Sequence, residues 1–237
     1  MRAVTVIPAK SVSRRLPGKN LKPLAGTPLF LHAVNLALRA GAFDAVYVSS
    51  DSPDILTLAV QAGAIGLARP PTLCTDAATN FLVLRHHVAE WRVAGNEADI
   101  IVLLQPTTPF RTVDALGAMF NRFAADAEAD SLVTVARASR LRGVVENGCW
   151  LPEGEAQTGG GRIQAMRELH EFTGHVVMLR PAQTLDRGSL LGERILAERL
   201  PTEWPDIDID TPEDWRIAEN FAHYLASGPT PRQEARA

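Results

Sequence analysis

The residues best suited to chemistry form a basic segment near the N-terminus. All three lysines of the chain, Lys10, Lys19 and Lys22, lie within this segment, whereas the other 21 of the 24 basic residues are arginines. Arg14 and Arg15 lie between the lysines, and nearby serines add hydroxyl donors. A lysine ammonium is a compact charge that suits phosphate, and a turning backbone adds N–H groups that bind anions. Five cations in one loop therefore predict a site for a polyanion, most simply a triphosphate.

The basic segment matches neither of the two common phosphate-binding motifs. Gly18-Lys19 is followed by Asn20 where a Walker A loop requires Ser or Thr, and Ser13 stands where the first glycine of that loop belongs. The GxGxxG fingerprint of dinucleotide-binding proteins is absent. These differences disfavour a P-loop ATPase and an NAD-dependent enzyme. A solvated basic loop is the alternative interpretation, but long structureless loops inside a compact domain are uncommon and usually functional.

A second candidate cluster lies near the C-terminus, in the sequence DIDID. On a strand, alternation places Asp206, Asp208 and Asp210 on one face and the two isoleucines on the other. Like charges on one face repel each other unless a cation lies between them, and Mg²⁺ takes one or two carboxylates together with substrate phosphates. Asp208 and Asp210, nearest the strand end, are the predicted metal pair. The alternative is a solvated acidic edge in which Asp210 or Thr211 only caps a helix.

The remaining reactive residues give weaker signals. His86 and His87 are adjacent, so on a helix we expect them to point in different directions and not to pair at metal-ligand spacing. Cys74 and Cys149 are too few for a disulfide framework or a zinc site, and no GxSxG motif supports a serine hydrolase. The cysteine usage and the lack of a secretory signal predict a cytoplasmic protein.

The elements that must position these segments alternate between strand and helix. We expect strands over residues 3–8, 45–49, 65–68, 99–105, 131–136, 176–179 and 206–210, and helices over about 27–41, 52–63, 80–93, 112–125 and 211–226. Thr27-Pro28 and Ser52 are typical helix starts, and Gly41 is a typical stop. This alternation predicts an open, mostly parallel α/β sheet, in which ligands bind beyond the carboxyl ends of the strands. Residues 137–174 have no clear period and predict an inserted flap.

Composition excludes several classes of protein. The 237 residues are 46% hydrophobic and 22% charged, which is typical of a folded globular domain. The net charge of −3, from 24 basic and 27 acidic residues, disfavours nucleic-acid binding. No apolar run reaches the length of about 18 residues that spans a bilayer. Neither a nucleic-acid partner nor a membrane partner is expected.

The chain resembles the acylneuraminate (CMP-sialic acid) cytidylyltransferases and their relatives that act on pseudaminic, legionaminic and Kdo-type acids. The matching segments span residues 4 to about 220 and read, in order, IPAKSVSRRLPGKN, RPPTLCTDAAT, LLQPTTPFR, RIQAMRELHEFTGHVVMLR and DIDIDTPEDW. The resemblance implies a three-layer α/β/α sandwich of the nucleotide-diphospho-sugar transferase kind, with one domain over 1–226. The residues 227–237 are expected to form a disordered tail. The resemblance also implies a homodimer in which an insertion of about 137–175 serves as the dimerisation arm.

The resemblance further implies a reaction and a set of residues. CTP and a 2-keto-3-deoxy sugar acid would give the CMP-sugar and pyrophosphate, with Mg²⁺ as cofactor. The nucleotide would be bound by Lys10, Ser11, Ser13, Arg14, Lys19, Asn20, Arg69 and Ala78. The sugar acid would be bound by Gln105, Arg162 and Gln164, and Mg²⁺ by Asp208 and Asp210. The residues expected to be catalytic are Lys19, Asp208 and Asp210.

Some positions depart from the family pattern. Lys10-Ser11-Val12-Ser13 stands where relatives carry Arg-Gly-Gly-Ser. The lost glycines would restrict positive φ and close approach of the backbone to phosphate. Val177 replaces an aromatic residue near the expected sugar side, which makes a variant sugar acid plausible. Two alternatives stay open: the same chemistry on a Kdo-type acid or with another base, and a catalytically silent nucleotide-binding homologue.

Overall fold

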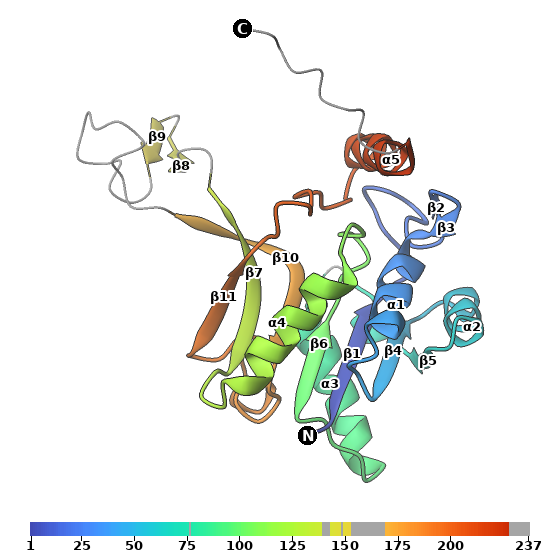
Figure 1. Ribbon diagram of the computed structural model, residues 1–237, viewed down its shortest axis with the longest axis vertical. Helices are drawn as coiled ribbons and strands as arrows, with labels where there is room; N and C mark the ends of the chain where they lie inside the picture. Colours follow the sequence, from blue (N-terminus) through green and yellow to red (C-terminus); the bar gives the residue numbers. More distant parts are fainter. Residues whose placement is uncertain (76, 139–142, 148, 153–168, 228–237) are drawn as a thin grey trace, which may run out of the picture.

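The computed structural model describes residues 1–75, 77–138, 143–147, 149–152 and 169–227. Its centre is a seven-stranded sheet in the order β11-β7-β10-β6-β1-β4-β5 (Figure 1). β10 runs antiparallel to both of its neighbours, and the other pairings are parallel. The strands are β1 (Ala3–Pro8), β4 (Ala45–Ser50), β5 (Ile65–Ala68), β6 (Ile100–Leu103), β7 (Ser131–Arg137), β10 (His170–Leu179) and β11 (Ile195–Arg199). The mostly parallel sheet confirms the predicted fold class.

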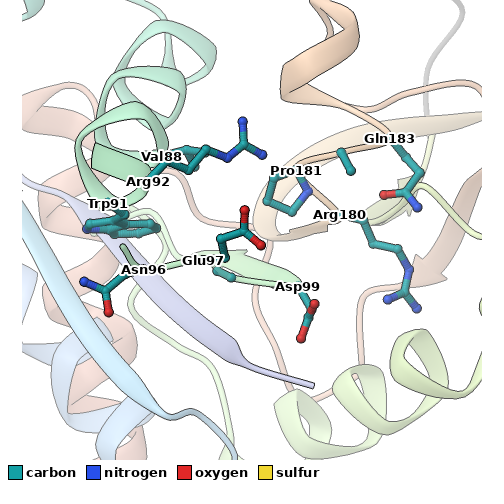
Figure 2. Close-up of a pocket in the computed structure, with 11 residues that line it drawn as sticks. Val88, Trp91, Arg92, Asn96, Glu97, Asp99, Arg180, Pro181 and Gln183 are labelled. Atoms are coloured by element: carbon teal, nitrogen blue, oxygen red, sulfur yellow. The ribbon is translucent and has the colours of Figure 1, made fainter. Parts of the chain in front are cut away.

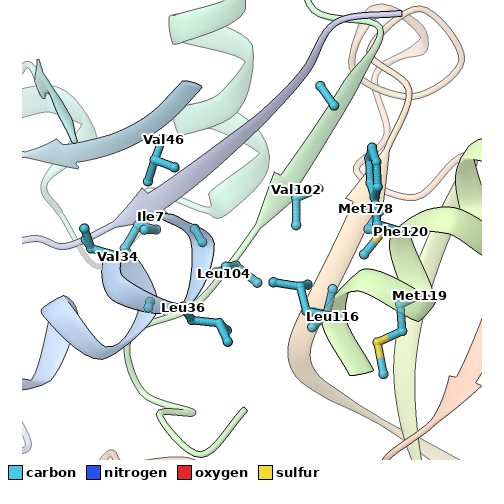
Figure 3. Packing of buried hydrophobic residues seen from close by; sticks show 14 of the residues in the cluster. Ile7, Val34, Leu36, Val46, Val102, Leu104, Leu116, Met119, Phe120 and Met178 are labelled. Carbon is cyan, nitrogen blue, oxygen red and sulfur yellow. The ribbon is translucent and has the colours of Figure 1, made fainter. Parts of the chain in front are cut away.

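Helices cover both faces of the sheet. They are α1 (Leu29–Ala40), α2 (Pro53–Gln61), α3 (Asn80–Val93) and α4 (Val113–Ala125), whereas α5 (Pro212–Ser227) packs outside the sheet. One apolar cluster joins α1, α2 and α4 to side chains such as Ile7, Val102 and Met178 (Figure 3). A second joins α3 to the opposite face, through Leu84 and Val88 packed with Val6. Because β1 and β6 are buried on both faces, their sequences are continuous apolar runs rather than alternating ones.

The helix ends follow local chemistry. The Ser52 hydroxyl accepts a hydrogen bond from the Ile55 N–H at 3.4 Å and caps α2, as predicted. Gly41 ends α1 in the left-handed conformation, with φ of 62°. Thr27 and Pro28, however, form the short strand β3 and pair with β2 (Pro23–Leu24), so α1 begins at Leu29 and lacks a side-chain cap.

Two sequence expectations for the C-terminal half are wrong. Residues 206–210 form no strand: the segment lies between two prolines, and its backbone bond to the rest of the fold runs from the Ile209 N–H to the Thr107 carbonyl at 2.8 Å. Residues 170–174, expected in the insertion, belong to β10, where His170 pairs with Arg137. An irregularity between Phe172 and Val177 interrupts the period-2 pattern that would have indicated this strand.

Within the expected insertion, the structure describes a short hairpin of β8 (Gly143–Glu146) and β9 (Cys149–Pro152). The edge strand β11 was not predicted from the sequence; its residues alternate between exposed and half-buried. Among the described helices, none is both long and apolar enough to cross a membrane. The expected tail lies outside the described residues, except for Ser227, which ends α5.

A third apolar cluster joins the two ends of the chain. Leu16 and Leu24 of the basic segment pack with Ile209 and with Trp215 of α5. The Lys22 ammonium lies 4.0 Å from the centre of the Trp215 ring. In Figure 1, α5 accordingly lies beside the β2–β3 hairpin. This cluster fixes the position of the basic segment relative to the acidic one.

We expect Trp215→Ala to destabilise the protein by about 3–5 kcal/mol, because it removes a side chain that is 2% exposed from the middle of this cluster. Urea unfolding measures the change. Ile217→Ala on the same helix is the control, since Ile217 is 54% exposed and its loss should change the free energy of unfolding by no more than about 0.5 kcal/mol. Equal losses in the two variants would contradict the packing described.

Candidate active site

The candidate site lies where three parallel strands end. Lys10 follows β1, Asp51 follows β4, and Gln105 follows β6 by two residues. Because β1 pairs in parallel with both β4 and β6, these three ends lie on one edge of the sheet. This is the edge at which open α/β sheets bind ligands.

The basic and acidic segments meet through an ion-pair cluster. The Lys19 ammonium lies 2.9 Å from Asp210 Oδ1 and donates to the Ile209 carbonyl at 3.0 Å. Arg15 Nη2 lies 2.6 Å from Asp210 Oδ2. Lys19 is the more enclosed of the two cations, with 13% of its side chain exposed against 66% for Arg15. The structure thus places the predicted catalytic Lys19 in contact with the predicted metal ligand Asp210.

Asp210 is positioned from its C-terminal side by a helix cap. The carboxylate of Asp214 accepts hydrogen bonds from the N–H groups of Asp210 and Thr211, at 3.0 and 2.8 Å. The Thr211 hydroxyl in turn accepts from the Asp214 N–H at 3.2 Å. This reciprocal pattern is a capping box, which fixes the direction in which the chain enters α5. The expectation that Thr211 caps the helix is confirmed, and Asp210 stands directly before the cap.

Asp51 is a site residue that the sequence analysis missed. Its Oδ1 accepts from the Ser11 N–H at 2.7 Å and its Oδ2 from the Ser11 hydroxyl at 2.6 Å. Burial alone would raise the pKa of Asp51, but these hydrogen bonds outweigh it and hold the pKa below the usual value. The available signal was its place directly after a buried strand, at the ligand-binding edge.

The backbone of the basic loop is compatible with Ser11 and Val12 in place of the family's glycines. Among the described non-glycine residues, positive φ occurs only at Ala25 and Asn147, so Ser11 and Val12 adopt this loop conformation without left-handed strain. Val12 is exposed. The described conformation therefore needs no glycine at positions 11 and 12, and the expected effect of the lost glycines on close approach of the backbone to phosphate stays a prediction.

Asn20 and Ser13 brace the basic loop from inside. Asn20 is buried, and its Nδ2 donates to the Lys10 carbonyl at 2.8 Å. The Ser13 hydroxyl accepts from the Leu16 N–H at 3.4 Å. Their predicted place in a nucleotide site stays a prediction, and what their contacts support is the loop backbone. Arg14 lies exposed on the same loop.

Arg69 lies at the neighbouring strand end, directly after β5. Its Nε donates to the Ser49 hydroxyl at 3.1 Å and its Nη2 to the Ser49 carbonyl at 2.8 Å. Burial lowers the pKa of its guanidinium. Ala78, the other predicted base-binding residue, is half-buried in the loop before α3.

Gln105 faces β10, on the predicted sugar side. Its Nε2 donates to the Gly174 carbonyl at 3.3 Å. Gly174 has a φ of +70°, which favours glycine, and a Cβ there would lie 2.7 Å from Gln105 Nε2, so a side chain at this position would displace the end of Gln105. Arg111 holds the same region, donating to the carbonyls of His175 at 2.6 Å and of Gln105 at 2.9 Å. Burial lowers the pKa of the Arg111 guanidinium to about 9.

The predicted magnesium ligands have donor chemistry that fits this ion. Asp208 is exposed and has no hydrogen-bond or ion-pair partner among the described residues. Asp210, two residues later, is half-buried and shared by two cations. Two carboxylates, one of them unengaged, suit a cation that is bound together with substrate phosphates. Arg162 and Gln164, expected to bind the sugar acid, lie outside the described residues.

One expectation about histidines is wrong. His86 Nε2 and His87 Nδ1 lie 3.2 and 3.3 Å from the same Glu90 oxygen, so these three ligand atoms lie within 4.8 Å of one another. The adjacent rings do not diverge as expected, because Glu90 on the next turn of α3 draws them together.

A cavity lies away from the candidate site, between the end of α3 and the segment after β10 (Figure 2). Its volume is about 290 Å³, and its lining includes Ala98 and Asp99 before β6 and Arg180 after β10. It therefore lies at the amino end of β6, opposite the strand ends that carry Lys10 and Gln105. Its charged groups have partners in the structure, as in the two 2.8 Å bonds of Arg92 to Asp186. The candidate site residues and this cavity thus lie at opposite ends of the strands.

Comparisons with known proteins agree with the geometry of the strand ends. A family model described as Cytidylyltransferase matches residues 4–147. CMP-N,N'-diacetyllegionaminic acid synthase of Legionella pneumophila is 29% identical, over 93% of this chain and 96% of that protein. N-acylneuraminate cytidylyltransferase of Streptococcus agalactiae is 26% identical over 91% of this chain, which spans about half of that relative (52%). The solved structure of CMP:2-keto-3-deoxy-manno-octonic acid synthetase complexed with CTP superposes with a TM-score of 0.71 at 19% identity, covering 96% of this chain and 99% of that chain.

The buried His87 predicts a pH dependence of stability. Burial lowers its pKa below the ordinary 6.5, the hydrogen bond to Glu90 opposes this only in part, and the charges of His86 and Arg69 reinforce it. Below about pH 6.5, His87 therefore becomes protonated in the unfolded chain but stays neutral in the native protein. The free energy of unfolding falls as the pH drops from there toward the lowered pKa. Above about pH 6.5 this contribution is fully present.

We expect His87→Gln to flatten the fall in unfolding free energy between about pH 7 and pH 5, measured by urea unfolding. The buried His175, whose pKa is also lowered by burial, leaves a residual slope. His86→Gln keeps His87 in place and should keep the wild-type slope. An unchanged slope in His87→Gln would show that His87 titrates alike in both states.

Proposed function

The chain belongs to the cytidylyltransferase family, and from that premise we propose that it joins CTP to a 2-keto-3-deoxy sugar acid of the sialic, legionaminic or pseudaminic type. The observation that carries this proposal is the cluster of Lys19, Arg15 and Asp210 at the carboxyl edge of the sheet. It brings the cations that a triphosphate needs beside a carboxylate that suits the accompanying metal. The names of the relatives support the class of sugar acid.

The proposed reaction is an in-line displacement at phosphorus. The anomeric hydroxyl oxygen of the sugar acid forms a bond to the α-phosphorus of CTP, and the bond from that phosphorus to the oxygen bridging to the β-phosphate breaks. The products are the CMP-sugar and pyrophosphate, and the hydroxyl proton leaves to a base. Such transfers depend mainly on positioning and on neutralising the phosphate charge.

The basic loop supplies that neutralisation in our proposal. Lys19 is largely enclosed, which strengthens its attraction for phosphate oxygens relative to a solvated lysine. A bound triphosphate would compete with Asp210 for Lys19 and Arg15 and so release the oxygens of Asp210. Lys10 and Arg14 lie on the same loop and would add charge at the phosphates.

Mg²⁺ is proposed as the cofactor, held by Asp208 and Asp210 together with the nucleotide phosphates. When bound, it would neutralise charge that builds on the phosphate oxygens. Arg69 is proposed to face the cytosine, together with the backbone around Ala78. Gln105 is proposed to contact the sugar acid.

Two substitutions test these roles. We expect Lys19→Ala and Asp210→Ala each to lower kcat by about 10²–10³-fold. Each should change the free energy of unfolding by no more than about 1 kcal/mol, because partly exposed ion pairs contribute little to stability. Asp206→Ala is the matched control in the same segment and should retain near wild-type turnover. Unchanged turnover in both Lys19→Ala and Asp210→Ala would refute the assignment.

The reaction itself is tested by pyrophosphate release with Mg²⁺. CTP, ATP, GTP and UTP are offered in turn with sialic, legionaminic, pseudaminic and Kdo acids. We expect release with CTP and one nine-carbon acid. Release only with Kdo would change the sugar, and release only with another nucleotide would change the base. Binding of CTP, seen as a raised Tm, without release from any pair would indicate a silent nucleotide-binding homologue.

A further inference from the structure

A continuous hydrogen-bond chain runs from the surface of α3 to Arg69. Glu90 Oε2 lies 3.3 Å from His87 Nδ1, and His87 Nε2 lies 2.7 Å from the Ser49 hydroxyl. That hydroxyl accepts from Arg69 Nε at 3.1 Å. The two middle members, His87 and Ser49, are both 0% exposed, and Arg69 is 7% exposed. Four side chains from α3, β4 and the end of β5 thus form one continuous series of hydrogen bonds between α3 and the sheet.

The ends of this chain determine where its protons lie. A guanidinium can only donate, so Ser49 Oγ accepts from Arg69 and directs its own hydrogen to His87 Nε2. His87 Nε2 is then the acceptor, and Nδ1 carries the ring proton toward the Glu90 carboxylate. The opposite tautomer would turn the lone pair of Nδ1 toward a carboxylate oxygen. One donor end and one acceptor end therefore select a single neutral tautomer of His87.

The hydrogen-bond chain leaves one nitrogen of the Arg69 guanidinium, Nη1, able to donate to another group. Nε and Nη2 are held by Ser49, through its hydroxyl and its carbonyl. Nη1 has no hydrogen-bond partner within the part of the chain that the structure describes, and Arg69 lies at the same sheet edge as Asp51. Nη1 can therefore donate to a molecule that enters this edge of the sheet.

We propose that Glu90, His87 and Ser49 are positioning residues that hold Arg69 in the orientation in which its Nη1 donates to the nucleotide base. This inference rests on the proposed function, since Arg69 is assigned there to the cytosine. None of the three positioning residues touches substrate. Their effect is to fix, before the nucleotide arrives, a side chain that would otherwise have to be ordered on binding.

The same residues offer a competing interpretation, a metal site formed by His86, His87 and Glu90. Their ligand atoms are close enough for one ion, and His86 Nε2 is buried without a hydrogen-bond partner among the described residues. The hydrogen-bond chain is favoured because both nitrogens of His87 are engaged within it. His86 contacts Glu90 but is not part of the hydrogen-bond chain, which makes His86 the matched control.

Steady-state kinetics with CTP test the proposal. His87→Leu and Ser49→Ala should each raise KM for CTP about tenfold, the effect of one lost hydrogen bond, and change kcat less than about twofold. His87→Gln, whose amide oxygen can accept from Ser49, should restore most of the affinity. His86→Gln should leave KM for CTP unchanged in the same assay with Mg²⁺. The double variant His87→Leu/Ser49→Ala should be no worse than either single variant.

Nitrogen NMR of the histidine side chains tests the chain without any turnover. We expect His87 protonated on Nδ1, in a signal that Ser49→Ala perturbs and His86→Gln does not. A proton on Nε2, or a His87 whose Nδ1 binds added Zn²⁺ in a manner lost in His86→Gln, overturns the proposal. Pyrophosphate release with KM unmoved in both His87→Leu and Ser49→Ala overturns it and leaves the proposed function intact. Absence of release with every nucleotide overturns the function and this role together.

Discussion

The site depends on the contact between the two ends of the chain. Lys19 and Asp210 are separated by 191 residues and meet only because Leu16 and Ile209 pack with Trp215 in one apolar cluster. The ion pair is partly exposed and contributes little free energy by itself. Burial of the leucines and of Trp215 stabilises the contact between the two segments, and this contact brings the charged side chains together. The long basic loop, which would be costly to order alone, is therefore held from both sides before any ligand binds.

The cations at this edge divide into two kinds by their partners. Arg111 and Arg69 are buried and have lowered pKa values. Arg111 donates to the carbonyls of His175 and Gln105, and Arg69 donates to the carbonyl and the hydroxyl of Ser49. They shape the floor of the site. Lys19 and Arg15 are instead paired with a carboxylate at the surface of the loop. Such a pair can exchange partners with an anionic ligand at small cost, because it gives up one charge contact for another. Rigid arginines and exchangeable loop cations thus have separate tasks.

The sequence predicted what depends on local pattern. Continuous apolar runs indicated β1 and β6, and Ser52 and Gly41 marked helix ends, because burial on two faces and capping act over a few residues. Prediction from the sequence failed where the conformation of a segment depends on residues that are distant along the chain. The DIDID segment alternates like a strand, yet its backbone finds no neighbouring strand to pair with. The contact of His87 with Ser49 across 38 residues had no local signature, and Asp51 was signalled only by its place directly after a buried strand. Their roles arise only when the strand ends and α3 are packed together.

The serine at position 11 shows how a departure from a motif can be structural rather than degenerative. A glycine there would offer an N–H group to Asp51 but no hydroxyl. Ser11 donates with both groups, and both oxygens of Asp51 are thereby occupied. The loop loses the freedom that glycine provides and gains a tether to the end of β4. If the loop binds an anion as proposed, a loop fixed in this way would need less ordering on binding, so the tether would compensate for the missing glycines through the unbound state rather than through a new contact to the ligand.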